Sequence, residues 1–263
     1  MASIWETTAM LFRAVSSKNQ QASGIYLVFQ IFILLAPLWV NAFAYMTLAR
    51  MVYFFHPSRM IFRMPAAIIS AVFVFFDLAA FVIQLIGGSM AGPGDSPEDQ
   101  RRAVNIYMAG IGFQQLVIVF FVGLCIVFQF QMAKLETHPG NSSTYRVRTK
   151  WFPLLCALYI ALSMITVRIV YRLVEFSGGI NQGNALTAKE IYFYVLEAAP
   201  MLIALSSFAL FHPARFMNGP GSDMPGPFTL LKNKLRRWKG KQEILDDGQE
   251  SDTHELMSKG DLR

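Results

Sequence analysis

The sequence predicts an all-α protein, a polytopic transmembrane helical bundle of about five spans. Of its 263 residues, 54% are hydrophobic and only 15% are charged, and the mean hydropathy is +0.40. This apolar surface exceeds what one soluble core of that length buries. It is also gathered in stretches of about 20 residues, the length at which a helix crosses the hydrocarbon core with its backbone amides hydrogen-bonded.

Five stretches meet that length test. We interpret the first as a permanent helix, since its apolar run starts late and lacks a small-residue cleavage site. Residues 1–24 are then an extracytosolic segment, residues 25–211 the membrane domain, and residues 212–263 a largely disordered cytosolic tail. The predicted spans are Ile25–Ala49, Ala66–Gly88, Val104–Met132, Trp151–Tyr171 and Ile191–Phe211.

Lysine and arginine set the orientation, because short loops rich in positive charge stay in the cytosol. The richer side of the predicted bundle holds Arg50, Arg59, Arg63, Lys134, Arg146, Arg148, Lys150 and the tail from Arg215 onward. This predicts an external amino terminus and a cytosolic carboxyl terminus. Asn141, in an Asn-Ser-Ser glycosylation pattern, would then face the cytosol and stay unmodified.

Ionisable groups recur at helical spacing inside three spans, where they are costly and usually mark functional sites. We expect Arg168 and Arg172 to pair with Glu197 and Glu175 in the outer half of the bilayer, with Asp77 deeper. Two interpretations stay open: a substrate-binding or translocation site, and ion pairs that only lock the helices together. The candidate site residues are Asp77, Gln84, Arg168, Arg172, Glu175, Glu190, Tyr194 and Glu197, and the same faces carry Phe81, Gly88 and Met201.

Small residues, amides and prolines predict how the helices pack. Pro37 and Pro200 lie inside spans, where proline kinks a helix and frees a backbone carbonyl. The third span carries residues that favour close helix approach, and we interpret them as packing rather than as a ligand site. They are Gly110, Gly112, Gln114, Gln115 and Gly123.

Histidine precedes proline at three predicted helix exits, at His56, His138 and His212. A zinc hydrolase would need ligands at close spacing, so a helix stop with histidine at the carboxyl end is the simpler interpretation. No Gly-x-x-x-x-Gly-Lys-[Ser/Thr] loop occurs. We therefore predict no cofactor, no metal, no enzyme activity and no nucleic-acid partner.

The tail is basic from Phe228 to Lys241 and acidic from Glu243 to Glu255. Lys232, Arg236 and Arg237 are expected to contact anionic lipid. A solvated tail that only satisfies the orientation rule explains the basic stretch equally well. Protein partners cannot be named from these residues.

The ordered motifs resemble the fungal lipid-translocating exporter family, which includes aminocholesterol-resistance proteins and sphingoid long-chain-base exporters. The resemblance rests on QIFILLAPLWVNAFAYMTLAR from Gln30, DLAAFVIQLIGGSM from Asp77, RIVYRLVE from Arg168, EIYFYVLEAAPM from Glu190 and HPAR from His212. Family members have seven spans, and ETTAMLFR from Glu6 resembles the outer end of their second helix. The five spans would thus be the last five of seven, in a truncated gene model or a shortened paralogue.

The resemblance implies a multi-pass protein of the plasma membrane, or of an endomembrane. It would export sphingoid long-chain bases or related amphiphiles and confer resistance to toxic lipids or drugs. Asp77, Glu197 and Glu175 would then hold an amine headgroup while aromatic side chains face the acyl chain. The alternative is a seven-helix-like sensor of membrane lipids that signals through its cytosolic tail.

Overall fold

The protein is a bundle of long α-helices. The computed structural model describes residues 1–18, 23–57, 60–61, 64–90, 96–137, 144–177 and 190–217, with single positions at 224, 226, 229, 232 and 236. The helices are α1 (Ala2–Lys18), α2 (Ser23–Phe55), α3 (Ala66–Met90), α4 (Pro97–Thr137), α5 (Thr144–Ser177), α7 (Glu190–Phe193), α8 (Ala199–Leu210) and α9 (Pro213–Phe216). A five-residue π-helix, η1 (Tyr194–Ala198), joins α7 to α8.

Five of these helical segments are long and apolar enough to cross a membrane, within the residues that the structure describes. The predicted all-α bundle of about five spans is therefore confirmed. The segments are Val28–Phe55, Ala66–Met90, Pro97–Leu135, Trp151–Ser177 and Ile191–Phe216.

Several helices extend beyond the predicted spans, because hydropathy marks only the part of a helix that suits lipid. The clearest case is the start of α4. The Ser96 hydroxyl oxygen accepts a bond from the Asp99 backbone amide (3.2 Å), and Pro97 occupies the first helical position, where a missing amide proton costs nothing. The helix thus begins seven residues before Val104.

A short antiparallel hairpin connects α2 to α3. Its strands β1 (Met60–Ile61) and β2 (Met64–Pro65) pair Met60 with Pro65 and Ile61 with Met64. Each strand has only two residues, and no alternating pattern in the sequence predicts them.

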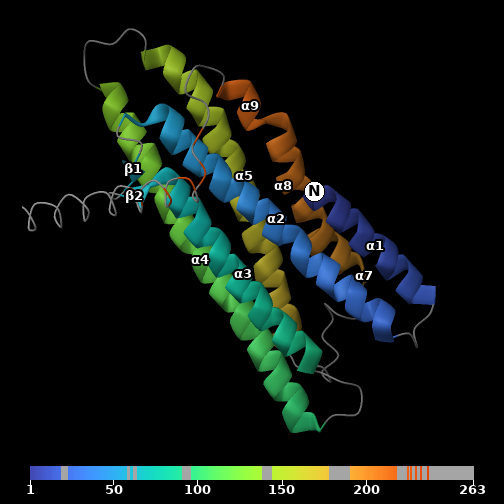
Figure 1. Ribbon diagram of the computed structural model, residues 1–263. Helices are drawn as coiled ribbons and strands as arrows, with labels where there is room; N and C mark the ends of the chain where they lie inside the picture. Colours follow the sequence, from blue (N-terminus) through green and yellow to red (C-terminus); the bar gives the residue numbers. More distant parts are fainter. Residues whose placement is uncertain are drawn as a thin grey trace, which may run out of the picture. The chain divides into compact units, whose positions relative to one another are not determined.

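The helices of the unit Met1–Ser222 pack in sequential order. α1 lies along α2, α2 against α3, α3 against α4 and α4 against α5, while α5 also packs against α8 (Figure 1). Trp5 and Phe12 of α1 bracket Phe32 of α2, with ring centroids 5.0 and 5.7 Å from it. Segments from both ends of the unit thereby meet around α2 and α5.

Two glycines set the close approach of α3 and α4. A Cβ atom on Gly87 would lie 2.5 Å from the backbone nitrogen of Tyr107, and one on Gly110 would lie 2.8 Å from Cγ of Gln84. Gly110 thus acts as predicted, whereas Gly112 and Gly123 have open space at the Cβ position. The buried stripe of α3 passes through Gly87 and not through the predicted Gly88, which is exposed, because the α4 backbone packs against Gly87.

Candidate functional site

A cluster of two arginines and two glutamates forms where α5 meets η1, and we call it the arginine centre (Arg168, Arg172, Glu175, Glu197). Glu197 is fully buried, and its Oε1 accepts bonds from Nη2 of Arg168 (3.0 Å) and Nη2 of Arg172 (2.6 Å). Nε of Arg172 donates to the same oxygen at 3.0 Å. One carboxylate oxygen thus holds two guanidinium groups from successive turns of α5.

Glu175 completes the charge balance of this cluster. Its Oε2 lies 3.6 Å from Nη1 of Arg172, one helical turn away, and its Oε1 accepts a long bond from the Tyr171 hydroxyl at 3.5 Å. Two positive and two negative side chains therefore offset one another. Such pairing lowers the large cost of burying charge in an apolar bundle.

Pro37 supplies a further acceptor for the arginine centre. Proline has no amide proton, so Pro37 leaves the carbonyl of Ile33, four residues earlier on α2, without its helical donor. Nη2 of Arg168 donates to that carbonyl at 2.6 Å. The freed carbonyl that the sequence predicts thus ties α5 to α2 at the candidate site.

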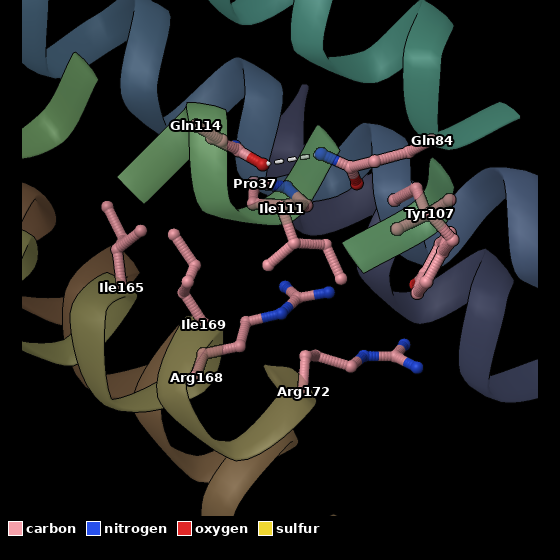
Figure 2. A pocket seen from close by; sticks show the side chains of 10 residues that line it. Pro37, Gln84, Tyr107, Ile111, Gln114, Ile165, Arg168, Ile169 and Arg172 are labelled. Atoms are coloured by element: carbon pink, nitrogen blue, oxygen red, sulfur yellow. Dashed lines mark hydrogen bonds between the residues drawn. The ribbon is translucent and has the colours of Figure 1, made fainter. Parts of the chain in front are cut away.

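A small cavity of about 20 Å³ borders the arginine centre. Figure 2 shows Arg168 and Arg172 rising from α5 on one side of it, and Gln84 and Gln114 meeting on another. Nε2 of Gln84 donates to Oε1 of Gln114 at 3.0 Å. The remaining lining is Leu34, Pro37, Tyr107, Ile111, Ile165 and Ile169, so α2, α3, α4 and α5 all contribute.

Asp77 belongs to a second cluster, the aspartate centre (Asp77, Asn41, Tyr45). Its Oδ2 accepts bonds from Nδ2 of Asn41 at 2.8 Å and from the Tyr45 hydroxyl at 2.9 Å. All three residues are at most 1% exposed. Asp77 precedes Gln84 by two turns of α3, and its greater depth in the membrane than the arginines stays a prediction.

The partners of Asp77 were not among the predicted site residues. Asn41 and Tyr45 sit one turn apart on α2, in a run whose other members are mostly apolar. Tyr45 is fixed by aromatic neighbours, because its ring lies 4.5 Å from Phe121 and 5.4 Å from Phe73, centroid to centroid. A buried carboxylate needs hydrogen-bond donors, so a search for donors on the neighbouring helices could have found Asn41 and Tyr45.

The structure does not bring every predicted site residue together. Tyr194 is 49% exposed, and its ring contacts that of the neighbouring Phe193, with centroids 5.7 Å apart. The prediction assumed 3.6 residues per turn, but the π-helix from Tyr194 to Ala198 is wider, so Tyr194 leaves the face that carries Glu197. Pro200, which cannot donate to a preceding turn, lies two residues after the end of this π-helix. The Glu190 side chain lies outside the described part of the structure.

α1 brings one more acid near the arginine centre. Both carboxylate oxygens of Glu6 are buried and have no partner within the described residues. Burial raises the pKa of Glu6 above its usual 4.5, and Glu197 adds to this, while Arg168 and Arg172 act in the opposite direction. On the same helix, the Arg13 guanidinium stacks over the Phe193 ring at 3.6 Å.

Two of the three predicted helix-exit histidines are described, and His138 lies outside that part. His212 caps α9, with Nδ1 accepting from the Ala214 amide at 3.3 Å. His56 follows the last residue of α2, and burial lowers the pKa of its imidazole. Among the described residues there is no group of three or more His, Cys, Asp or Glu able to hold a metal.

Other predictions fall partly or wholly outside the described residues. Asn141 and Arg237 lie outside them. Lys232 and Arg236 are described as single exposed positions. Contact of these tail residues with anionic lipid, and the unmodified state of Asn141, remain predictions.

Comparison with known proteins places these residues in a family. The model described as "RTA1 like protein" matches residues 1–220, and no solved structure matches the chain. "Probable lipid transporter atnI" of Emericella nidulans is 41% identical over 229 residues, which are 86% of this chain and 60% of that protein. "Protoporphyrin uptake protein 1" of Saccharomyces cerevisiae is 25% identical, over 79% of this chain and 65% of its own length.

"Sphingoid long-chain base transporter RSB1" of Saccharomyces cerevisiae is 22% identical over 92% of this chain and 70% of its length. The chain spans about three fifths of the length of the first relatives named. The predicted resemblance to fungal lipid-translocating exporters is thus confirmed. With a family match over residues 1–220 and a relative at 41% identity, the chain belongs to the RTA1-like protein family.

Proposed function

We propose that this multi-pass membrane protein translocates amphiphilic lipids, with sphingoid long-chain bases as the favoured substrate class. The observation that carries the proposal is the arginine centre, which lies inside an apolar bundle and beside a cavity that four helices line. Charged groups are rare in membrane helices because they are costly, and they usually serve transported ligands or ions. The names of the relatives support the same class of function.

The amine of a long-chain base has two buried acceptors available. Oδ1 of Asp77 and Oε2 of Glu197 are both buried and have no hydrogen-bond partner within the described residues. An ammonium group supplies the donors and the charge that such oxygens require. Gln84, Arg168, Arg172 and Glu175 would shape the polar route between them, and Glu190 and Tyr194 remain predicted members of the site.

Transport, and not catalysis, is the activity proposed. We further propose the plasma membrane as the location, with an endomembrane as the alternative, and a cytosolic carboxyl terminus, on the basis of the lysine and arginine distribution. Export toward the outer leaflet would make cells resistant to toxic lipids or drugs. Lys232, Arg236 and Arg237 would hold the tail on anionic lipid.

The test is efflux of a labelled long-chain base from sensitive cells, with the Asp77→Asn and Glu197→Gln variants made in this chain and at the matching positions of a full-length relative. Each variant keeps the shape of the side chain and removes its charge. We expect efflux to fall about tenfold or more, as expected when a charged partner is lost. Glu98→Gln, at an exposed acid in the first turn of α4, is the matched control.

Variants that reach the membrane in parental amounts and export at the parental rate would refute this role for the acids. Deletion of residues 223–263 separates transport from the alternative of a lipid sensor. A transporter keeps its basal efflux without the tail, whereas a sensor that signals through the tail loses its output.

A further inference from the structure

We infer that the cavity at the arginine centre binds an anionic group, a carboxylate or a phosphate carried by an amphiphile, at Arg168. The inference rests on the proposed function because it takes the ligand to be an amphiphile. It adds that one polar group of that ligand carries a negative charge. It concerns a donor group of the protein, distinct from the acids proposed above to hold an amine.

Arg168 has donor capacity that no described residue uses. Its Nη2 is satisfied by the Ile33 carbonyl (2.6 Å) and by Glu197 (3.0 Å). Its Nη1 is buried and has no partner within the described residues, and the whole residue is 3% exposed. A guanidinium stays protonated, so this nitrogen carries positive charge as well as unused N–H groups.

The cavity presents positive charge without an acid in its lining. Arg168 and Arg172 both line it, whereas Glu197 and Glu175 do not. An ammonium group entering there would meet two guanidinium groups first. A carboxylate or phosphate would instead accept hydrogen bonds from Nη1 of Arg168, because the planar guanidinium group matches the geometry of these anions.

Neutral polar groups around the cavity add donors of the right kind. Tyr107 lines it, and its hydroxyl oxygen accepts from Nε2 of Gln30 at 3.4 Å, which leaves the hydroxyl proton free to donate. Gln84 and Gln114 satisfy one bond between themselves at 3.0 Å. The apolar walls of Leu34, Ile111 and Ile165 suit the start of an acyl chain.

The experiment is a competition measurement on the purified full chain in an uncharged maltoside detergent. Radiolabelled dodecyl phosphate is the probe. Dodecanoate, dodecylamine, dodecanol and inorganic phosphate are the competitors, so that chain length stays constant while headgroup charge changes. We expect dodecanoate to displace the probe at least ~10-fold more effectively than dodecanol or dodecylamine, as expected when charge-assisted bonds distinguish the headgroups.

Three variants localise the binding. Ile165→Phe fills the cavity while keeping every arginine, so it blocks the site. Arg168→Gln removes the charge, so it removes a charge-assisted hydrogen bond to the ligand. Each variant should weaken probe binding about tenfold or more. Arg13→Gln is the matched control, because Arg13 is a cation that does not line the cavity. It should stay within about twofold of the parent.

The competition on the parent chain decides the question even if a variant fails to fold. Displacement by dodecylamine or dodecanol as effective as that by dodecanoate, or no saturable binding of the probe, would overturn the inference. Displacement by inorganic phosphate at the concentration of dodecanoate would support the anion site and identify a soluble anion as its ligand. Efflux of a long-chain base, measured separately, tests the proposed function whatever the anion result.

Discussion

The arginine centre and the aspartate centre lie in one bundle but handle buried charge differently. At the arginine centre, opposite charges pair directly, and Nη1 of Arg168, beside a cavity, has no partner among the residues that the structure describes. At the aspartate centre, a single acid is held by two neutral donors, and Asp77 is not among the residues that line the cavity. The first therefore borders the cavity, whereas the second lies apart from it.

Helix α3 connects the two centres. Gln84 lines the cavity and Asp77 sits two turns away on the same buried stripe, which Gly87 holds tightly against α4. A lipid headgroup that reached Oδ1 of Asp77 would have to separate α3 from its neighbours, because Asp77 is 1% exposed and Asn41 and Tyr45 of α2 donate to its Oδ2.

The largest expected effect comes from breaking the arginine centre. Glu197→Gln leaves two buried guanidinium groups that share no full negative charge, and removal of one partner from a buried pair costs about 3–5 kcal/mol in unfolding free energy. Glu175→Gln is the matched change at the longer, more exposed pair and should cost less than Glu197→Gln, because Glu175 contacts only one of the two guanidinium groups. Thermal unfolding in detergent measures both, and equal losses would contradict the central place of Glu197.

Close packing of α3 on α4 should be nearly as sensitive. Gly87→Ala places a Cβ atom 2.5 Å from the Tyr107 backbone nitrogen, and such overpacking costs about 1–3 kcal/mol. Gly88→Ala, one residue along, meets no atom within 4 Å and should leave the unfolding temperature unchanged. Similar unfolding temperatures for the two variants would show that α3 does not pack as described.

The aspartate centre should respond more weakly than either. Tyr45→Phe keeps the ring contacts with Phe121 and Phe73 but removes one donor to Asp77. A hydrogen bond to a charged group contributes about 1.5–3 kcal/mol, and the remaining bond from Asn41 should hold the loss near the lower limit. A loss as large as that of Glu197→Gln would reverse the comparison between the centres.

The smallest effect is a pH dependence at Glu6. Its pKa in the folded protein lies above the usual 4.5, with burial as the main cause, so the folded state binds more protons than the unfolded state between these two values. Stability should therefore fall as pH rises from 4.5 through the raised pKa. Glu6→Gln should flatten this part of the unfolding curve, and an unchanged slope would exclude Glu6 as its source.

Sequence reasoning reached the arginine centre because charge in an apolar span is a strong signal. The i, i+4, i+7 spacing of Arg168, Arg172 and Glu175 fixed their shared face before any packing was known. Pro37 also predicted that a backbone carbonyl of α2 would lack its helical donor, which is the carbonyl of Ile33. The sequence did not predict that Arg168 would be the donor to it. These features depend on local chemistry, which one sequence carries.

The remaining features depend on packing between helices. The spacing of Tyr194 from Glu197 predicts one shared face of an α-helix. The π-helix changes the rotation per residue, so the two side chains leave that face, and a search for α-helical periodicity does not detect a π-helix. Helical spacing from Asp77 selects Gly88 and not Gly87, and it does not separate Gly112 from Gly110; only the facing backbone does so. Asn41 and Tyr45 could be assigned to Asp77 only once α2 and α3 were placed together.

Efflux of a labelled long-chain base tests the account most directly. Sensitive cells expressing this chain should lose the label faster than vector controls, Asp77→Asn should abolish most of that gain, and Gly112→Ala, at a position with open space, should keep it. Efflux equal to the vector control, with the chain present at the membrane and a full-length relative active beside it, would contradict the account.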